Sequence, residues 1–376
     1  MKRSMSLALM LMVTLCVPAA THVSAQGGRR GATPATSAPS ARPPQTLDIY
    51  FIDVEGGQAT LVVTAAGESL LIDAGYPGDS SLIAPAFGEK PGKPGEARDP
   101  ERIMAAAKDA GISRIDYLLM THSHADHGGG VLEISKMLPV RNIVNHIPPV
   151  PDAETNVAGT HKIYERFIEA GVGVNHIEPK PGEKLPMKGV DVFFVSANGQ
   201  VLTKALPGAG QKNTTCTGTG IDAQEKYENP FSNGIKLQYG QFSFLDVGDL
   251  TGPGLFALGC PANLVGLADV YLVAHHGGND GADPSLFQAL KPRIAVFNNG
   301  VRKGAQANTL ATVKQLGIDG WQLHKTQNTG AENAPDARIA NLDESTAAWI
   351  RVTAKADGSF TVTNGRTKET KTYAKR

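Results

Sequence analysis

The stretch Thr121-His122-Ser123-His124-Ala125-Asp126-His127, followed at once by three glycines, dominates this sequence. It places three imidazoles and one carboxylate within seven residues. Imidazole nitrogens and carboxylate oxygens are the donors that bind Zn²⁺ and related divalent ions. Side chains of an extended segment repeat their direction every second residue, so His122 and His124 point the same way. Asp126 and His127 follow after a turn, and the stretch therefore predicts a site for two metal ions about 3.5–4 Å apart.

Two other apolar runs also lead to residues that bind metals. The run 270–274 ends in His275-His276, and the run 242–247 leads to Asp249. Because α/β enzymes assemble their sites at the C-terminal ends of strands, we expect these segments to meet the histidine-rich stretch. A histidine-rich surface loop without metal is the alternative. The buried strand predicted at 115–120, directly before the stretch, argues against it.

These motifs resemble those of the metallo-β-lactamase-fold hydrolases. The pattern H-x-H-x-D-H lies at 122–127, Gly248-Asp249 forms a later acidic step, and His275-His276-Gly277 follows. The segments 51–54 and 71–75 make the chain similar to one branch in particular, the hydrolase-like domain of ComEC-type competence proteins and their secreted stand-alone relatives. The resemblance implies an αββα sandwich of four layers, with two mixed sheets face to face and helices outside. Strands that come first and then alternate with helices agree with this architecture.

The donor chemistry suggests a role for each residue of the site. The predicted metal ligands are His122, His124, Asp126, His127, Asp249 and His275. Asp249 can bridge the two ions, because a carboxylate has two oxygens. Between the adjacent histidines we favour His275 as the ligand and expect His276 to line the pocket, although the sequence leaves this choice open. The predicted catalytic residues are Asp126, Asp249 and His276.

Further polar residues are predicted to support the ligands. Asp73, at the end of the predicted strand 69–73, is a candidate to accept a hydrogen bond from a ligand histidine, and an ordinary turn aspartate is the alternative. Many superfamily members supply a third histidine to the first metal. Here the corresponding segment offers Asn229, Ser232 and Asn233 instead, so we predict an amide or hydroxyl group near that metal. The remaining histidines are expected on the surface or in the core: His146, His161 and His176.

Composition and charge restrict the classes of function. The chain has 376 residues, of which 41% are hydrophobic, and its 36 basic residues balance 36 acidic ones. This is typical of a globular enzyme with a sizeable core. Without a basic excess there is no strong sign of nucleic-acid or membrane-surface binding. The oligomeric state is not predicted.

The N-terminus has the features of an export signal. Lys2-Arg3 precede the apolar run 7–17, and Val23-Ser24-Ala25 forms a small-residue cleavage site. The apolar run is too short for a stable membrane span, and no span is expected in the mature chain. We therefore predict a periplasmic or extracellular protein. The predicted organisation is a signal peptide at 1–25, a disordered Pro/Ala/Ser-rich spacer at 26–46, a hydrolase domain at 47–365 and a solvated basic tail at 366–376.

Two cysteines, Cys216 and Cys260, remain after cleavage of the signal peptide. In an oxidising compartment they can form one disulfide. They can also be free and buried, or Cys260 can lie near the metals, and the sequence does not separate these alternatives.

The function predicted from these features is hydrolysis by a metal-bound hydroxide at a centre that holds two Zn²⁺ ions, with Mn²⁺ or a single metal as alternatives. The expected substrate is a phosphodiester or another small ester. A lactonase or β-lactamase-type hydrolase is the first alternative. A non-catalytic accessory or binding protein that keeps the fold is the second, and the near-complete set of ligands argues against it.

Overall fold

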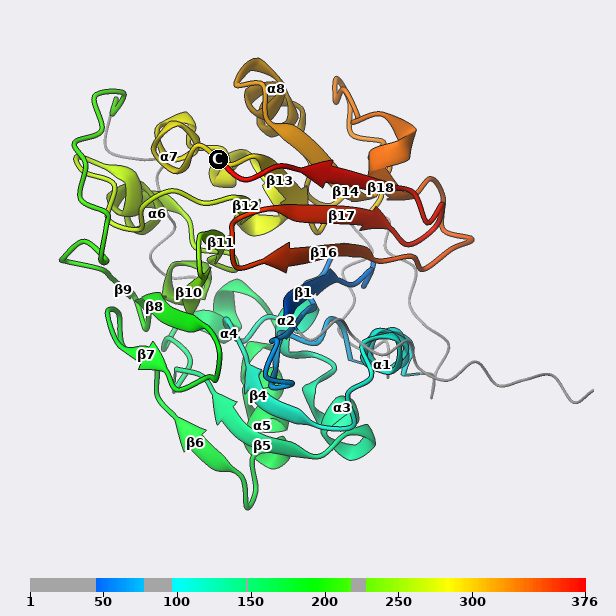
Figure 1. The fold of residues 1–376 in the computed structure, drawn as a ribbon. Helices are drawn as coiled ribbons and strands as arrows, with labels where there is room; N and C mark the ends of the chain where they lie inside the picture. Colours follow the sequence, from blue (N-terminus) through cyan, green and yellow to red (C-terminus); the bar gives the residue numbers. More distant parts are fainter. Residues whose placement is uncertain (1–44, 78–96, 147, 218–227) are drawn as a thin grey trace, which may run out of the picture. The chain divides into compact units, whose positions relative to one another are not determined.

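Two mixed β-sheets form the centre of the computed structural model, which describes residues 45–77, 97–146, 148–217 and 228–376 (Figure 1). The first sheet has, among the described residues, nine strands in the spatial order β18 (Thr370–Tyr373), β17 (Phe360–Asn364), β16 (Ile350–Lys355), β1 (Thr46–Phe51), β2 (Thr60–Val63), β3 (Ser69–Ile72), β4 (Ile115–Leu119), β5 (Val140–Val144) and β6 (Asn175–Ile177). The second has the order β15 (Ile339–Asn341), β14 (Asp319–His324), β13 (Ile294–Phe297), β12 (Val270–Leu272), β11 (Phe242–Asp246), β10 (Gly234–Tyr239), β8 (Asp191–Ala197) and β7 (Lys184–Leu185), with β9 (Gln200–Val201) paired to β8.

Each sheet contains a run of parallel strands. In the first sheet β3, β4, β5 and β6 are parallel neighbours. In the second, β11 is followed by parallel β12, β13, β14 and β15. Within each run the C-terminal ends of the strands therefore share one edge of the sheet, where loops that follow neighbouring strands can assemble a site.

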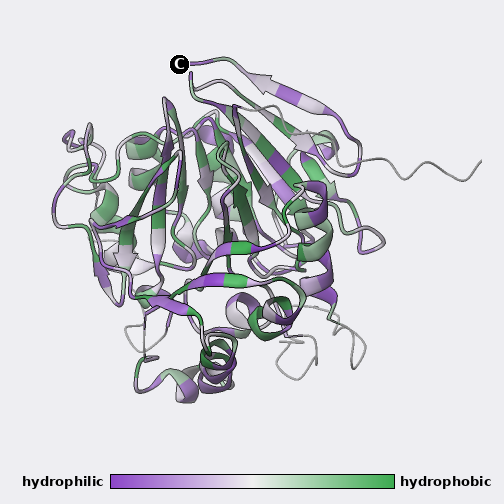
Figure 2. Cartoon of the chain, turned by 60° about the horizontal axis from the view of Figure 1, so that its bottom comes forward, coloured by the Kyte–Doolittle hydropathy of each residue, from purple (hydrophilic) through white to green (hydrophobic). Residues whose placement is uncertain are grey.

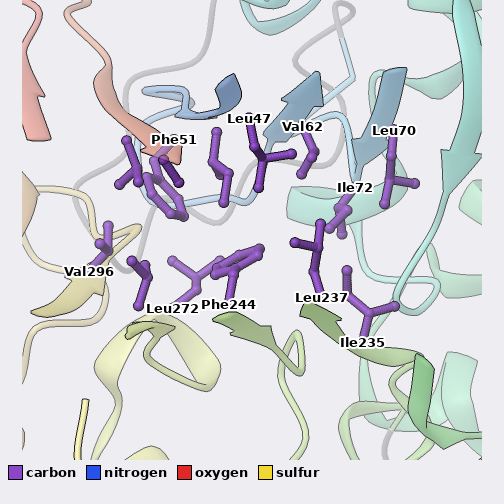
Figure 3. Packing of buried hydrophobic residues seen from close by; sticks show 14 of the residues in the cluster. Leu47, Phe51, Val62, Leu70, Ile72, Ile235, Leu237, Phe244, Leu272 and Val296 are labelled. Atoms are coloured by element: carbon purple, nitrogen blue, oxygen red, sulfur yellow. The ribbon is translucent and has the colours of Figure 1, made fainter. Parts of the chain in front are cut away.

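The two sheets pack face to face around an apolar core (Figure 3). Phe51 of β1 and Phe244 of β11, one from each sheet, lie with their ring centroids 5.7 Å apart in an edge-to-face arrangement. Leu70 and Ile72 contribute from the first sheet and Leu272 from the second. All six residues of β1 are buried, as expected for a strand that is covered on both faces.

Helices cover the outer faces of both sheets. Those of the described chain are α1 (Arg98–Asp109), α2 (Ala125–Gly128), α3 (Val131–Met137), α4 (Ala153–Asn156), α5 (Thr160–Ala170), α6 (Gly252–Gly259), α7 (Pro284–Leu290) and α8 (Ala307–Gln315). Ile103 of α1 and Phe167 of α5 share a cluster with Leu61 of the first sheet. Leu286 of α7 shares another with Tyr271 of the second sheet. Hydrophobic and hydrophilic residues share individual helices (Figure 2), which suits helices that bury one face.

These layers confirm the predicted α/β architecture of two mixed sheets with helices outside, which is consistent with a metallo-β-lactamase fold. The predicted strands 69–73 and 115–120 and the apolar runs 242–247 and 270–274 correspond to β3, β4, β11 and β12. Asp283 caps α7, since its side chain accepts from Ser285 N at 2.8 Å. Asp99 lies inside α1, where its carboxylate accepts from Tyr76 N at 2.8 Å.

The C-terminal residues correct another prediction. We expected a solvated, partly frayed tail beyond residue 365, but β18 pairs with β17 at the edge of the first sheet, and Tyr373 is buried. Arg376 Nε lies 3.1 Å from Asp269 Oδ1, and its Nη2 donates to Ala268 O at 3.0 Å. The basic residues are thus held by specific acceptors, which a count of charges does not reveal.

Some predictions fall outside the described residues. The signal peptide and almost all of the spacer do so. Within the described residues, no helix combines the length and apolar character needed to cross a bilayer. Cys216 and Cys260 form a disulfide with a Cα–Cα distance of 5.8 Å, which settles the alternatives left open for these cysteines.

Candidate metal centre

The histidine-rich stretch follows β4 as an extended segment that turns into the short helix α2. His124 still has extended backbone angles, and α2 begins at the next residue. The loop is held from both sides, because Gln58 N donates to Asp126 O at 2.9 Å and Asn233 N donates to Thr121 O at 2.9 Å. Close packing explains the adjoining glycines: a Cβ atom on Gly129 would lie 2.2 Å from Ala125 O.

Four ligand-type side chains converge beyond this loop. One ligand atom from each of Asp126, His127, Asp249 and His276 lies within 4.8 Å of all the others, and all four residues are buried. His127 Nε2 is 3.2 Å from both Asp249 Oδ2 and His276 Nε2. His276 Nε2 is 3.1 Å from Asp126 Oδ2. The structure thus brings together residues from the segments that follow β4, β11 and β12, although 150 residues separate the first from the last.

His122 and His124 form a second pair of donors beside this cluster. His122 Nε2 lies 2.9 Å from His124 Nδ1 and 4.0 Å from Asp249 Oδ2. Asp249 therefore stands between the two sets, as expected for a bridging carboxylate. Burial, followed by the neighbouring histidines, holds the pKa of His122 well below its ordinary value, and burial lowers the pKa of His124 to about 4. Both imidazoles are neutral at pH 7, which is the form that binds metal.

The donor set fits divalent ions. Burial alone would lower the pKa of His127, but Asp249, Asp126 and Asp73 raise it well above its ordinary value. The three carboxylates thus favour positive charge at the His127 ring. A bound metal ion would supply this charge in place of a proton. Among the described residues, Asp249 Oδ1 is also buried without a hydrogen-bond partner. An unpaired buried carboxylate oxygen of this kind fits a bound cation.

The roles of the two adjacent histidines, His275 and His276, differ from our expectation. His276 Nε2 belongs to the four-residue cluster, whereas His275 Nε2 lies 3.7 Å from Asp249 Oδ2 and His275 Nδ1 lies 2.7 Å from Asp280 Oδ1. Both histidines have a positive φ, 51° and 55°, in the turn η3 (His275–Gly277). This unusual turn directs the second side chain inward, so His276 takes the position that we assigned to His275.

Asp73 is positioned as an orienting acceptor. It is fully buried, and its carboxylate lies 2.7 Å from His127 Nδ1 and accepts from Thr121 N at 2.7 Å. A carboxylate at Nδ1 leaves the Nε2 lone pair of His127 free for a metal. This geometry is not that of an ordinary turn aspartate, the alternative considered above.

The predicted substitutes for a third histidine lie around the site at different depths. Asn229 Nδ2 is 3.4 Å from His275 Nε2, so Asn229 borders the centre. Ser232 Oγ is 3.4 Å from His122 Nδ1, the ring nitrogen that faces away from His124. Asn233 Nδ2 donates to Met120 O at 2.9 Å and braces the backbone. Neither of the ligand clusters found among the described residues contains a remaining histidine (His146, His161 or His176).

Sequence reasoning missed Lys303. Its ammonium group contacts Asp126 Oδ2 and lies 3.2 Å from the Tyr76 hydroxyl. Together with His275 and His276 it lines a cavity of about 460 Å³. Lys303 follows β13, a parallel neighbour of β12, so the strand-end argument that located the histidines could have found it.

A second buried group of ligand type is Asp53, Glu55 and His324. Here Arg102 already pairs with both carboxylates, at 2.9 Å each. His324 Nε2 lies 2.7 Å from Asp53 Oδ1, and although burial lowers the pKa of His324, Asp53 raises it above its ordinary value. Arg102 and His324 thus already occupy these carboxylates, and we assign no metal to this group.

Comparisons with known proteins agree with this fold. Residues 52–156 match the family model described as the metallo-beta-lactamase superfamily, a range that contains the histidine-rich stretch but ends before Asp249 and His276. No curated protein matches the sequence.

Solved structures with a similar fold are distant. The metallo-beta-lactamase fold protein YhfI from Bacillus subtilis is 12% identical, with 74% of this chain and 95% of that chain covered and a TM-score of 0.41. Igni18, a metallo hydrolase from Ignicoccus hospitalis, is 15% identical, with 76% and 96% covered and a TM-score of 0.40. The diiron β-hydroxylase CmlA from Streptomyces venezuelae is 17% identical over 69% of this chain, with a TM-score of 0.37, and this chain spans 46% of its length. TM-scores this low add no argument of their own. The family match is confined to residues 52–156, and the four-layer fold is consistent with a metallo-beta-lactamase fold.

Proposed function

We propose that this chain is an exported, metal-dependent hydrolase with a binuclear centre that prefers zinc. The observation that carries the proposal is the convergence of Asp126, His127, Asp249 and His276 within 4.8 Å, directly beside the His122–His124 pair. Three separate segments contribute to this arrangement. A structural role would not require so many buried ionisable groups in one place.

The two sets of donors divide into two metal positions. His122 and His124 would hold the first ion, His127 and His276 with Asp126 the second, and Asp249 would bridge them. Imidazole-rich sets with a few carboxylates favour Zn²⁺ over harder ions. Bound divalent ions would polarise an ester oxygen and lower the pKa of coordinated water towards neutrality.

The substrate that we propose is a phosphodiester or another small anionic ester. Lys303 supports an anionic group, because its ammonium lies at the edge of the cavity over His275 and His276. Lys303 also contacts Asp126, one of the proposed metal ligands, so its ammonium group lies beside the metal centre. Positive charge there would stabilise the negative charge that develops on the substrate in the transition state. Resemblance of the sequence motifs to the ComEC-type branch favours the phosphodiester.

Export is part of the proposal. The disulfide between Cys216 and Cys260 supports an oxidising compartment, since such bonds persist there and are rare in the cytosol.

The test is hydrolysis of bis-p-nitrophenyl phosphate by the purified protein, before and after removal of metal with a chelator and after reloading with Zn²⁺ or Mn²⁺. A lactone and a chromogenic β-lactam run in parallel cover the alternative hydrolase. We expect close to two metal ions per chain and activity that is lost with the chelator and restored by zinc. A protein that contains no metal and takes none up would exclude the catalytic function. A protein that binds two ions but cleaves none of the substrates would favour the accessory role.

A further inference from the structure

Each histidine of the site has one ring nitrogen that faces away from the metal positions. In all of these histidines but one, that nitrogen lies next to a hydrogen-bond acceptor. These contacts are His122 Nδ1 to Thr121 Oγ1 at 3.1 Å, His127 Nδ1 to Asp73 Oδ2 at 2.7 Å, His275 Nδ1 to Asp280 Oδ1 at 2.7 Å and His276 Nδ1 to Asn298 O at 3.3 Å. His124 is the exception. Its Nε2 is buried and makes no hydrogen bond to any residue that the structure describes.

The chemistry of His124 requires such an acceptor. Its Nδ1 faces His122 Nε2 at 2.9 Å, so Nδ1 is the atom offered to the first metal. A neutral imidazole that binds metal through one nitrogen carries its proton on the other. The proton on Nε2 therefore points to the opposite side of the ring, where a buried donor without a partner is costly.

A buried carboxylate lies beside the His124 loop. Glu228 is 0% exposed, its Oε2 accepts from Ser123 N, the residue before His124, at 3.2 Å, and its charge is among those that raise the pKa of His124 against the effect of burial. Its Oε1 accepts from Val150 N at 2.7 Å. This resembles the position of Asp73, which accepts from Thr121 N and faces His127. The loop thus has one buried carboxylate behind each half of the centre.

His146 backs Glu228 from the neighbouring strand. His146 follows β5, the parallel neighbour of β4, and its Nε2 lies 3.4 Å from Glu228 Oε2. Ser123 Oγ, beside His124 in sequence, and both ring nitrogens of His146 are also buried and make no hydrogen bond within the described residues. Buried polar groups without a direct partner are typically satisfied by an internal water.

We propose that Glu228, backed by His146, is the positioning residue for the first metal site: it accepts the Nε2 proton of His124, directly or through one water, and so fixes the ring that binds the ion. The proposal rests on the metal centre of the proposed function. It gives a role to two buried ionisable residues that the site otherwise leaves unexplained. Such outer carboxylates typically contribute 10–100-fold to metal affinity.

The test is competition between the full-length protein and a chromophoric chelator for Zn²⁺, with Co²⁺ absorption spectra as a second readout. His276→Ala removes a ligand of the second site only, so the ion that this variant retains reports on the first site. In that background we expect Glu228→Gln to weaken Zn²⁺ binding by about 10–100-fold and to shift the Co²⁺ bands. His146→Gln should have the same effect to a smaller degree.

Glu154→Gln is the matched control. Glu154 also accepts from two backbone N–H groups, Gly159 N at 2.8 Å and His161 N at 3.0 Å, but it is exposed and lies on the outer helices. It should change neither affinity nor spectrum. Unchanged Zn²⁺ affinity and an unchanged Co²⁺ spectrum in Glu228→Gln would overturn the inference. If that variant does not fold, the same result in His146→Gln would overturn it.

The experiments distinguish failure of this positioning role from failure of the proposed function. Two bound ions, the expected loss in Glu228→Gln and no hydrolysis of any ester would refute the hydrolase and keep the positioning role. A protein that takes up no metal would refute both.

Discussion

Asp73→Asn tests how the second metal position is organised. Asp73 has φ 60°, a conformation that asparagine tolerates better than other residues, so the variant changes the charge without adding backbone strain. The wild-type carboxylate accepts from Thr121 N and from the Thr121 hydroxyl and holds His127 Nδ1, each at 2.7 Å. In Asp73→Asn the side-chain amide keeps one acceptor oxygen, and an NH₂ donor replaces the other oxygen.

The new NH₂ group changes which tautomer of His127 is favoured. An NH₂ group next to Nδ1 favours the tautomer in which Nδ1 accepts and Nε2 carries the proton, and a protonated Nε2 cannot bind metal. We expect the affinity of the second site to fall by about 10–100-fold, which is about 1.4–2.7 kcal/mol. Loss of one charge-assisted hydrogen bond costs about 1.5–3 kcal/mol, so the Tm of the metal-free protein should fall by roughly 2–4 °C for a domain of this size.

The assay is stepwise Zn²⁺ titration against a chelator, with thermal unfolding of the metal-free protein. Asp116→Asn is the control, because Asp116 is also buried and accepts from a backbone N–H, that of Ser69 at 3.1 Å, but lies at the opposite end of β4. It should lower Tm without changing metal affinity. Two zinc ions bound to Asp73→Asn with wild-type affinities would refute the tautomer argument.

Three further perturbations have distinct expected results. His276→Ala should lose one metal ion and turnover while His275→Ala keeps both ions, and the reverse order in metal analysis would restore our original choice of ligand. Burial raises the pKa of Asp246 to about 7, so the folded metal-free protein binds this proton more tightly than the unfolded chain. Its contribution to stability is therefore present at low pH and lost as pH rises from the unfolded pKa of about 4 to about 7. The Tm of Asp246→Asn relative to wild type should accordingly increase between pH 5 and pH 8, and a difference independent of pH would contradict this. Reduction of the disulfide, which joins residues 44 apart, should cost up to about 4 kcal/mol and lower Tm, whereas a Cys216→Ser variant should not respond to reductant.

Much of the site was predictable because its signals are local. Alternation along His122-Ser123-His124 and the turn before Asp126 depend only on neighbouring residues. Strand ends at β4, β11 and β12 follow from short apolar runs, and parallel strands place their C-terminal ends together. Asp73, predicted only from its position at a strand end, proved to contact His127.

Other features depend on residues far apart in the chain. β16, about 300 residues after β1, completes the first sheet beside it, and no short-range pattern indicates that pairing. Glu228 carries a single charge in a polar loop, where the sequence offers no sign of a partner, and only the fold brings it to Ser123. Lys303 lies beyond a strand end, where the sequence could have indicated it, but only the fold brings it to its partner Asp126.

The α/β class and the set of donors could be predicted from the amino-acid sequence, because residue type and local periodicity specify which groups are present and which strands deliver them. The entry of His276 rather than His275 into the cluster could not, because side-chain direction there depends on two positive φ angles in η3. The same holds for the pairing of the C-terminal residues as β18 and for the buried carboxylates of Asp73 and Glu228, which accept from backbone N–H groups of the metal loop. A ligand residue is chosen by local chemistry, whereas its orientation and its buried partners are set by contacts that form when distant segments pack.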